Sequence, residues 1–184
     1  RDSPQSKSVT TAQAKYPSLA VAEPTAAIAA AEVVFLATPF AANEAAIAET
    51  GDLTGKILVD CTNPVGPNLS HGLNSERSGA EVVQSLAPTA RVVKAFTIYG
   101  FENFENPAYP GYGDLKPAML IAGNDPAAKE VIAGLCTELG WDPVDTGNLA
   151  MSLHLEHLTL LWIQMARVQG QGAGFVWARL QRQT

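Results

Sequence analysis

The sequence has little of the chemistry that marks several common classes of protein. It contains two cysteines among 184 residues, Cys61 and Cys136, which are far apart and lack Cys-x-x-Cys spacing. Neither a disulfide framework nor a zinc knuckle is therefore indicated. Few cysteines and no disulfide pattern fit a reducing compartment, so we expect a cytoplasmic protein.

Basic clusters and long apolar runs are missing as well. Lys and Arg number 12 against 18 Asp and Glu, for a formal net charge of −6, and the basic residues form no long run. This distribution gives no electrostatic footprint for nucleic acid or for an anionic membrane. No apolar run reaches the roughly 18 residues of a spanning helix, and the polar N-terminus lacks an apolar signal segment. We therefore expect no nucleic-acid and no membrane partner.

What the sequence does contain is an alternation of apolar runs and helix-like segments. Continuous β-branched and apolar runs, as opposed to alternating ones, are typical of strands in a sheet covered on both faces. The sequence thus predicts a doubly wound, mostly parallel α/β sheet, with "EVVFLATP" as a strand buried on both faces. Strands are expected at 19–22, 32–39, 56–62, 91–96, 118–123 and 141–147, and helices at 6–15, 23–31, 41–49, 78–86, 125–139 and 148–166.

The C-terminal part of the chain departs from this alternation. Leucine, tryptophan and methionine recur at helical spacing over 148–166, and no strand is expected after them. We divide the chain into an α/β domain, 1–147, and a C-terminal helical segment, 148–184, that covers the sheet or serves a homodimer. A last helical turn through Trp177 and Leu180 is expected. The apolar stripe consists of Leu155, Leu158, Leu161, Trp162 and Met165.

Three predicted strands end in chemically distinctive segments. Proline stops a strand ladder because it has no N–H, and Thr-Pro and Asn-Pro pairs therefore hold polar groups at a strand end. In doubly wound sheets, ligands bind outside the carboxyl ends of the strands. Capping of the next helix is the competing interpretation for the Thr and Asn. The segments are Thr38, Pro39 and Phe40; Asn63 and Pro64; and Phe96, Thr97 and Ile98.

Several of these segments together carry a resemblance to a known family. "EVVFLATPFAANEAAI", "GDLTGKILVDCTNPVGP", "RVVKAF" and "IAGNDPAAKEVIAGLCTELGWDPVDTGNL" occur in the same order as in the NADPH-dependent F420 reductases. The dinucleotide-binding fold of that family recurs in the STEAP-type metalloreductases. The resemblance covers essentially the whole chain, and this order is more specific than any single motif.

The resemblance implies an NADP(H)-dependent oxidoreductase that transfers a hydride between NADPH and a deazaflavin (F420) or flavin-like acceptor. Residues 1–147 would then be its NADP-binding Rossmann-type domain, incomplete at the N-terminus. Thr38, Pro39 and Phe40 match the segment under the nicotinamide and ribose, and Asn63 with Pro64 matches the next strand end. Phe96, Thr97 and Ile98 match a third segment, in which relatives commonly have Phe-Asn-Thr or His-Thr-Ile. Since the cofactor supplies the reactivity, no catalytic proton donor is assigned.

The opening "RDSPQSK" matches the family at the exit of a second strand. Arg1 and Lys7 occupy the positions that bind the adenosine 2′-phosphate, and the planar guanidinium suits such a group. About 30 residues, which carry the family's first strand, glycine-rich turn and first helix, would then precede Arg1. The chain as given is accordingly expected to lack the pyrophosphate cradle and to bind the cofactor weakly. A non-catalytic NADP(H) sensor or structural subunit is the alternative function.

The remaining glycine cluster lies near the C-terminus. Gly170-x-Gly172-x-Gly174 follows a predicted helix. A phosphate-binding fingerprint instead follows a strand, so the cluster is not assigned to phosphate binding. A comparable turn in the family lies close to the flavin-like ring, and Gly170 and Gly172 are therefore candidate substrate-binding residues. A plain helix break is the alternative.

Other candidates for chemistry are weaker. His154 and His157 share a helix face without a third metal ligand, so no metal site is assigned. His71 is expected in a flexible loop with no identifiable acid partner, and Cys61 as a small core residue. The aromatic-rich loop over 99–113 is a candidate wall or lid for a planar substrate, unless it packs on the sheet edge.

Overall fold

The computed structural model describes residues 6–182. Its strands lie close to the apolar runs of the sequence, which confirms the predicted α/β class. The strands are β1 (Val33–Leu36), β2 (Ile57–Asp60), β3 (Arg91–Lys94), β4 (Ala118–Gly123) and β5 (Asp142–Asp145). The α-helices are α1 (Lys7–Lys15), α2 (Pro24–Ala29), α3 (Asn43–Ala48), α4 (Gly79–Leu86), α5 (Glu102–Glu105), α6 (Pro126–Glu138) and α7 (Ser152–Ile163), with short turns η1 (Phe40–Ala42), η2 (Pro67–Leu69), η3 (Leu149–Met151) and the π-helical η4 (Gln164–Val168).

The five strands form one sheet in the order β1-β2-β3-β4-β5. The pairs β1–β2, β2–β3 and β4–β5 are parallel, whereas β3 and β4 are antiparallel and pair Lys94 with Ala122. The carboxyl ends of β1, β2 and β3 therefore lie together at one end of the sheet. The first residue of β4, Ala118, lies at the same end.

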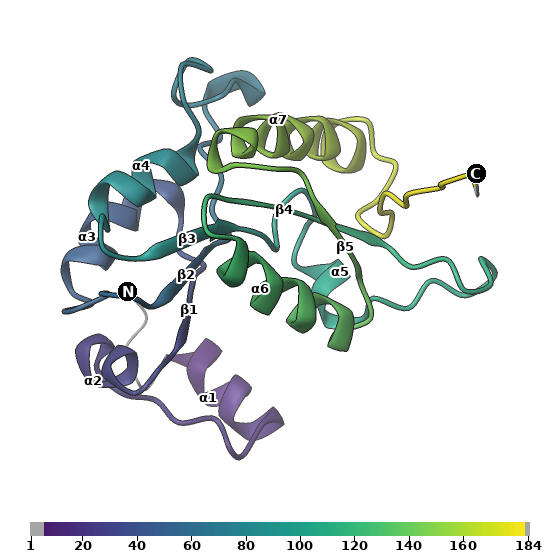
Figure 1. Cartoon of the computed structure of the whole chain (residues 1–184). Coiled ribbons are helices and arrows are strands. Elements are labelled where there is room, and N and C mark those ends of the chain that lie inside the picture. The colour runs from purple at the N-terminus through teal and green to yellow at the C-terminus, as the bar shows by residue number, and fades with distance from the viewer. Residues whose placement is uncertain (1–5, 183–184) are drawn as a thin grey trace.

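Helices cover the sheet on both faces. Figure 1 shows α3, α4 and α7 on one side of the strands and α6 on the other. Neighbouring residues of β3 face opposite cores: Val92 belongs to the cluster with Val83 of α4, and Val93 to the cluster with Ile132 of α6. Sequence signals start the helices as expected, since Asp125 accepts a hydrogen bond from Ala128 N at the start of α6.

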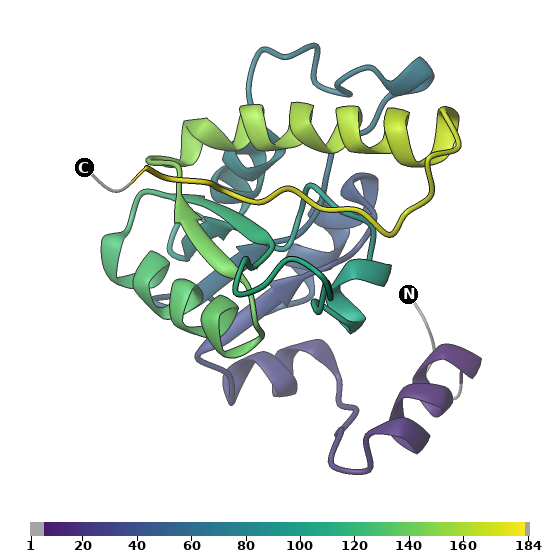
Figure 2. The same cartoon turned by 90° about the vertical axis from the view of Figure 1, so that its right-hand side faces the viewer.

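The N-terminal arm, residues 6–23, stands outside these layers. Helix α1 buries no residue, and both views place it beyond the β1 edge of the sheet (Figures 1 and 2). The strand predicted over 19–22 is wrong. Leu19 and Val21 are exposed in a segment without strand pairing, because no neighbouring strand supplies hydrogen bonds.

Two further predictions need correction. Strand β1 is not buried on both faces, since 48% of the Phe35 surface is exposed at the edge of the sheet. The expected helical turn through Trp177 and Leu180 is an extended tail, in which Ala118 N donates to Trp177 O over 2.8 Å. In Figure 2 the tail runs below α7, across the side of the molecule that faces the viewer.

Helix α7 forms where the sequence predicts it. Leu155 and Trp162 are buried in the core, so part of the apolar stripe packs within the chain. Leu161 is exposed, and its use in a homodimer remains a prediction. After α7 the backbone widens into a π-helical turn and then bends at Gly170 and Gly172, both of which have positive φ.

Candidate functional site at the carboxyl ends of the strands

The first two strand ends are linked by hydrogen bonds between side chains. Thr38 follows β1, and its hydroxyl donates to Asn43 Oδ1 over 2.8 Å. The amide of Asn43 donates to Thr62 Oγ1 over 2.9 Å, and that hydroxyl donates to Asp60 Oδ1 over 2.6 Å. Thr38 therefore does more than precede a helix, since it joins a relay that reaches the end of β2.

A second group of bonds joins the ends of β2 and β3 to helix α7. Asn63 Oδ1 accepts hydrogen bonds from the hydroxyls of Thr97, at 2.8 Å, and Thr159, at 2.9 Å. The Thr159 oxygen in turn accepts from Ile98 N over 3.1 Å. Thr159 lies too far along the chain to be assigned to this site from its sequence position, and the sequence analysis missed it. The structure thus brings together two of the predicted strand ends through a residue of α7.

The backbone after β3 is unusual. Phe96 and Ile98 have φ values of 51° and 65°, in the left-handed region that bulky and β-branched residues rarely adopt. Contacts on both sides hold the segment: Phe96 N donates to Met119 Sδ over 3.2 Å, and Ile98 N bonds to Thr159. Strained conformations of this kind persist only where the surroundings fix them, and they cluster at binding and catalytic sites.

A buried ion cluster lies directly beneath these loops. Lys94 Nζ is 2.9 Å from both Asp60 Oδ2 and Glu156 Oε1, and it donates to the Thr62 carbonyl. Lys94 and Asp60 have no exposed surface. Burial alone would lower the pKa of Lys94, but the two carboxylates outweigh this effect and raise the pKa above its usual range. The ammonium therefore ties β2, β3 and α7 together as a permanent cation.

Glu156 also occupies the start of helix α4. Its Oε2 accepts from Gly79 N over 2.9 Å, and its Oε1 from Ala80 N over 3.4 Å. A side chain at Gly79 would be excluded, because its Cβ would lie 2.9 Å from Phe40 Cε2 and 3.1 Å from Pro64 Cδ. The positive end of α4 is consequently satisfied by a carboxylate of the protein itself.

His71 corrects a prediction of the sequence analysis. It is buried, not part of an open flexible loop, and its Nε2 lies 2.8 Å from Glu156 Oε2. Its Nδ1 accepts from the backbone N–H groups of Leu73 and Ser75, so Nε2 carries the hydrogen that is donated to Glu156. The acid partner was not identifiable because it lies 85 positions away.

Aromatic side chains cover the outer side of the β3 end. The rings of Phe35 and Phe96 are 5.4 Å apart between centroids, and Phe104 lies 6.1 Å beyond Phe96. Part of the aromatic-rich loop therefore packs on the core, while Phe101 and Tyr112 remain exposed. Phe96 and Asn63 are half-buried, so each keeps some accessible surface at the strand ends.

The other predicted site residues are spread more widely. Arg1 lies outside the described residues. Lys7 is exposed on α1, in the arm beyond β1, and Pro39 is exposed before η1. Gly170 and Gly172 are exposed in the bend after η4. Cys61 is partly buried against the core, where burial raises the pKa of its thiol to about 12.

The part of the chain that the structure describes, residues 6–182, contains no metal cluster and no membrane-spanning helix. In that range no group of three His, Cys, Asp or Glu side chains is placed to hold a metal ion. His157 instead bonds to Ser75 Oγ at 2.9 Å. The same range contains no helix with both the length and the apolar character needed to cross a membrane.

The parallel strand ends, the covering helices and the uncharged polar groups between them define a Rossmann-type dinucleotide-binding fold. The model of the family described as "NADP oxidoreductase coenzyme F420-dependent" matches residues 2–64. A structure described as a putative F420-dependent NADP reductase from Arthrobacter sp. FB24 is 30% identical, with a TM-score of 0.83 over 94% of this chain and 80% of that one. The chain belongs to the F420-dependent NADP oxidoreductase family, which confirms the resemblance seen in the sequence.

Other relatives match part of the chain. Rat metalloreductase STEAP3 is 33% identical over 147 residues, which are 79% of this chain and 28% of the relative. Mouse metalloreductase STEAP2 is 30% identical over 108 residues, 59% of this chain and 20% of the relative. The chain thus spans only a fifth to just over a quarter of these curated relatives. An imine reductase from Aspergillus terreus, 20% identical with a TM-score of 0.58 over 90% of this chain and 52% of that one, shares the fold alone.

Proposed function

We propose that the chain binds NADP(H) across the carboxyl ends of β1, β2 and β3. The observation that carries this proposal is the coupling of Thr38, Asn63 and Thr97, each following a different parallel strand, into hydrogen-bonded groups at one end of the sheet. Membership of an NADP oxidoreductase family supports the same cofactor. Pro39, Phe40 and Phe96 keep accessible surface and are proposed to contact the cofactor, and the buried Pro64 and Ile98 support them.

The residues present fit the nicotinamide end of such a cofactor. Hydroxyl and amide groups of Thr38 and Asn63 suit a carboxamide, and the accessible part of Phe96 suits a flat ring. The charged side chains of the Lys94 cluster are buried, so the cluster places no charged group at this surface. Bound NADPH would supply the hydride, while the protein orients the ring and excludes water.

The assignment of the other end of the cofactor rests on the sequence. Arg1 and Lys7 are proposed for the adenosine 2′-phosphate, which would favour NADP over NAD. We further propose that the chain is an enzyme whose hydride acceptor is F420 or a flavin, with Gly170 and Gly172 near the acceptor. The Arthrobacter structure's description as a putative F420-dependent NADP reductase supports this choice. A cytoplasmic homodimer remains part of the proposal.

The natural protein should be tested for NADPH binding by fluorescence and for anaerobic bleaching of F420 and of flavin by NADPH. Asn63→Ala should weaken NADPH binding about tenfold, because two hydroxyls lose their shared acceptor and the wall loosens. Asn148→Ala is the matched control, since Asn148 is exposed beyond β5. Unchanged affinity in Asn63→Ala would contradict the proposed site. NADPH binding without bleaching of either acceptor would favour the non-catalytic sensor.

A further inference from the structure

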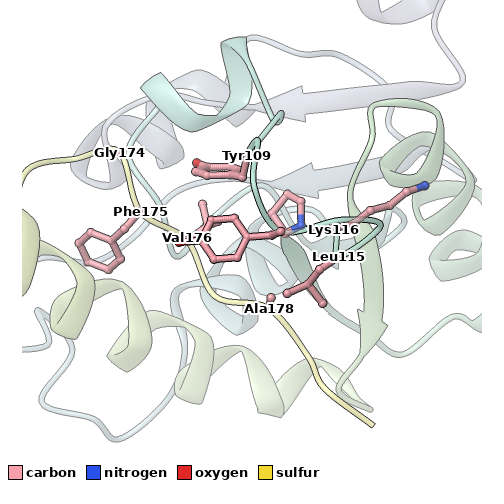
Figure 3. A pocket seen from close by; sticks show the side chains of 9 residues that line it. Tyr109, Leu115, Lys116, Gly174, Phe175, Val176 and Ala178 are labelled. Carbon is pink, nitrogen blue, oxygen red and sulfur yellow. The ribbon is translucent and has the colours of Figure 1, made fainter.

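A separate cavity of about 180 Å³ lies between the loop that enters β4 and the C-terminal tail. It is at the same end of the sheet as the strand ends described above, because β4 runs antiparallel to β3. Its lining includes none of the residues proposed for NADP(H). The lining residues are Tyr109, Tyr112, Leu115, Lys116, Pro117, Gly174, Phe175, Val176 and Ala178 (Figure 3).

The tail wall of the cavity is fixed at alternate residues. Asn103 Nδ2 donates to the Ala173 carbonyl over 2.9 Å, Trp162 Nε1 donates to the Phe175 carbonyl over 3.0 Å, and the Trp177 carbonyl accepts from Ala118 N. Gly174, Phe175, Val176 and Ala178 of this tethered segment line the cavity.

The loop wall is bonded to the same anchors. Tyr109 donates its hydroxyl hydrogen to Asn103 Oδ1, so the buried Asn103 joins both walls. The hydroxyl of the buried Tyr99 makes a second bridge, since it donates to the Ala118 carbonyl and accepts from Trp177 N over 3.1 Å. The cavity is therefore formed before any ligand arrives, which reduces the ordering cost of binding.

Its size restricts the ligand. A protein cavity of roughly 150 Å³ accommodates benzene, whereas drug-sized ligands occupy about 300 to 1,000 Å³. A volume of about 180 Å³ thus fits one six-membered ring with a small substituent and is too small for a tricyclic deazaflavin or flavin. This cavity and the proposed acceptor site are consequently different sites.

The charge of the lining restricts the ligand further. Lys116 is the one charged residue of the lining, and no carboxylate accompanies it. Its side chain extends outward from the rim in Figure 3, so the positive charge of the lining lies at the rim and not at the floor of the cavity. The two tyrosine rings provide flat surface, and Pro117 adds apolar surface. We propose that this cavity binds a single-ring aromatic ligand that carries one negative charge.

Calorimetric titration of the whole chain with benzoate, benzamide and cyclohexanecarboxylate tests the proposal. Benzoate should bind about threefold to fivefold more tightly than neutral benzamide, the effect expected of one exposed ion pair. Lys116→Met should reduce benzoate to the affinity of benzamide, and the puckered cyclohexane ring should bind more weakly than benzoate. Equal affinity for benzoate and benzamide would overturn the assignment of charge, and the absence of binding by all three would overturn the site.

Gly174→Leu tests the location of the ligand. Gly174 lines the cavity and a Cβ there meets no atom within 4 Å, so a larger side chain can be introduced without a clash at Cβ. Gly134→Leu on α6 is the matched control, since its Cβ also meets open space. Gly174→Leu should reduce benzoate affinity about tenfold, because the leucine side chain occupies the space of the ligand. The unfolding midpoint and the NADPH affinity should not change. Equal benzoate affinity in the two variants would place the ligand elsewhere.

Discussion

Two parts of the molecule differ in how they are stabilised. One is the block around Lys94, which consists of the buried ion cluster and the elements β2, β3 and α7 that it joins; the other is the N-terminal arm. In the block, Asp60, Lys94 and Glu156 are almost entirely buried and come from three elements far apart in the chain. In the arm, α1 buries nothing and the segment after it exposes Leu19 and Val21. The comparison teaches that the local pattern decides which element forms, while long-range partners decide whether the element contributes to the core.

Replacement of Lys94 by Met should have the largest effect on this difference. The change leaves the carboxylates of Asp60 and Glu156 buried without their cation, which is expected to lower the free energy of unfolding by about 3 to 5 kcal/mol. Urea denaturation followed by circular dichroism measures the loss. Lys15→Met on α1 is the control, because Lys15 is exposed and only distantly paired with Glu105 at 3.8 Å. A loss below about 1 kcal/mol for Lys94→Met would show that the ion cluster does not hold the block.

Alkaline pH should weaken the folded core, which contains Lys94 and both cysteines. Burial raises the pKa of the Cys61 and Cys136 thiols from 9.0 to about 12, and the pKa of Lys94 is raised as well. Above about pH 9 the unfolded chain therefore releases protons that the folded chain retains, and the free energy of unfolding should fall as pH rises. The Cys61 thiol alone should contribute a slope of up to about 1.4 kcal/mol per pH unit.

Urea titrations at pH 7, 9 and 10 would measure this decline. The double variant Cys61→Ala with Cys136→Ala should show a smaller decline of the unfolding free energy, because it lacks the contribution of the two thiols. The same shifts predict native-state alkylation at pH 8 about a thousandfold slower than in urea, because the thiolate fraction is that much smaller. Rapid labelling of both cysteines in the folded protein would contradict their placement.

The same comparison explains what the sequence could predict. Apolar runs such as "VVFL" and "ILVD" mark β1 and β2 because burial on a sheet requires them, and Asp125 and Ser78 mark the starts of α6 and α4 by capping. The family segments likewise locate the strand ends. Strand propensity failed over 19–22, where the residues suit a strand but no partner strand lies beside them.

Long-range pairing was beyond local patterns. Lys94 and Glu156 are separated by 62 positions and His71 and Glu156 by 85, so no spacing rule connects them. One signal was available: a lysine within the apolar run "VVKAF" has to find buried carboxylates if that run is a central strand. The partner itself could not be named, because α7 reaches the strand ends only through the tertiary fold.

The smallest expected effect concerns helix α1. Glycine in a helix interior costs about 1 kcal/mol relative to alanine, but only where the helix unfolds together with the core. Ala12→Gly should therefore change the global free energy of unfolding by well under that amount, whereas Ala133→Gly, on α6 and packed against the core, should cost at least the full amount. Urea unfolding of the two variants measures both. Amide exchange should show α1 opening without the rest of the molecule, because α1 shares no buried residue with it. An equal loss of unfolding free energy in the two variants would mean that the arm unfolds together with the block. The two regions would then differ only in how exposed their residues are.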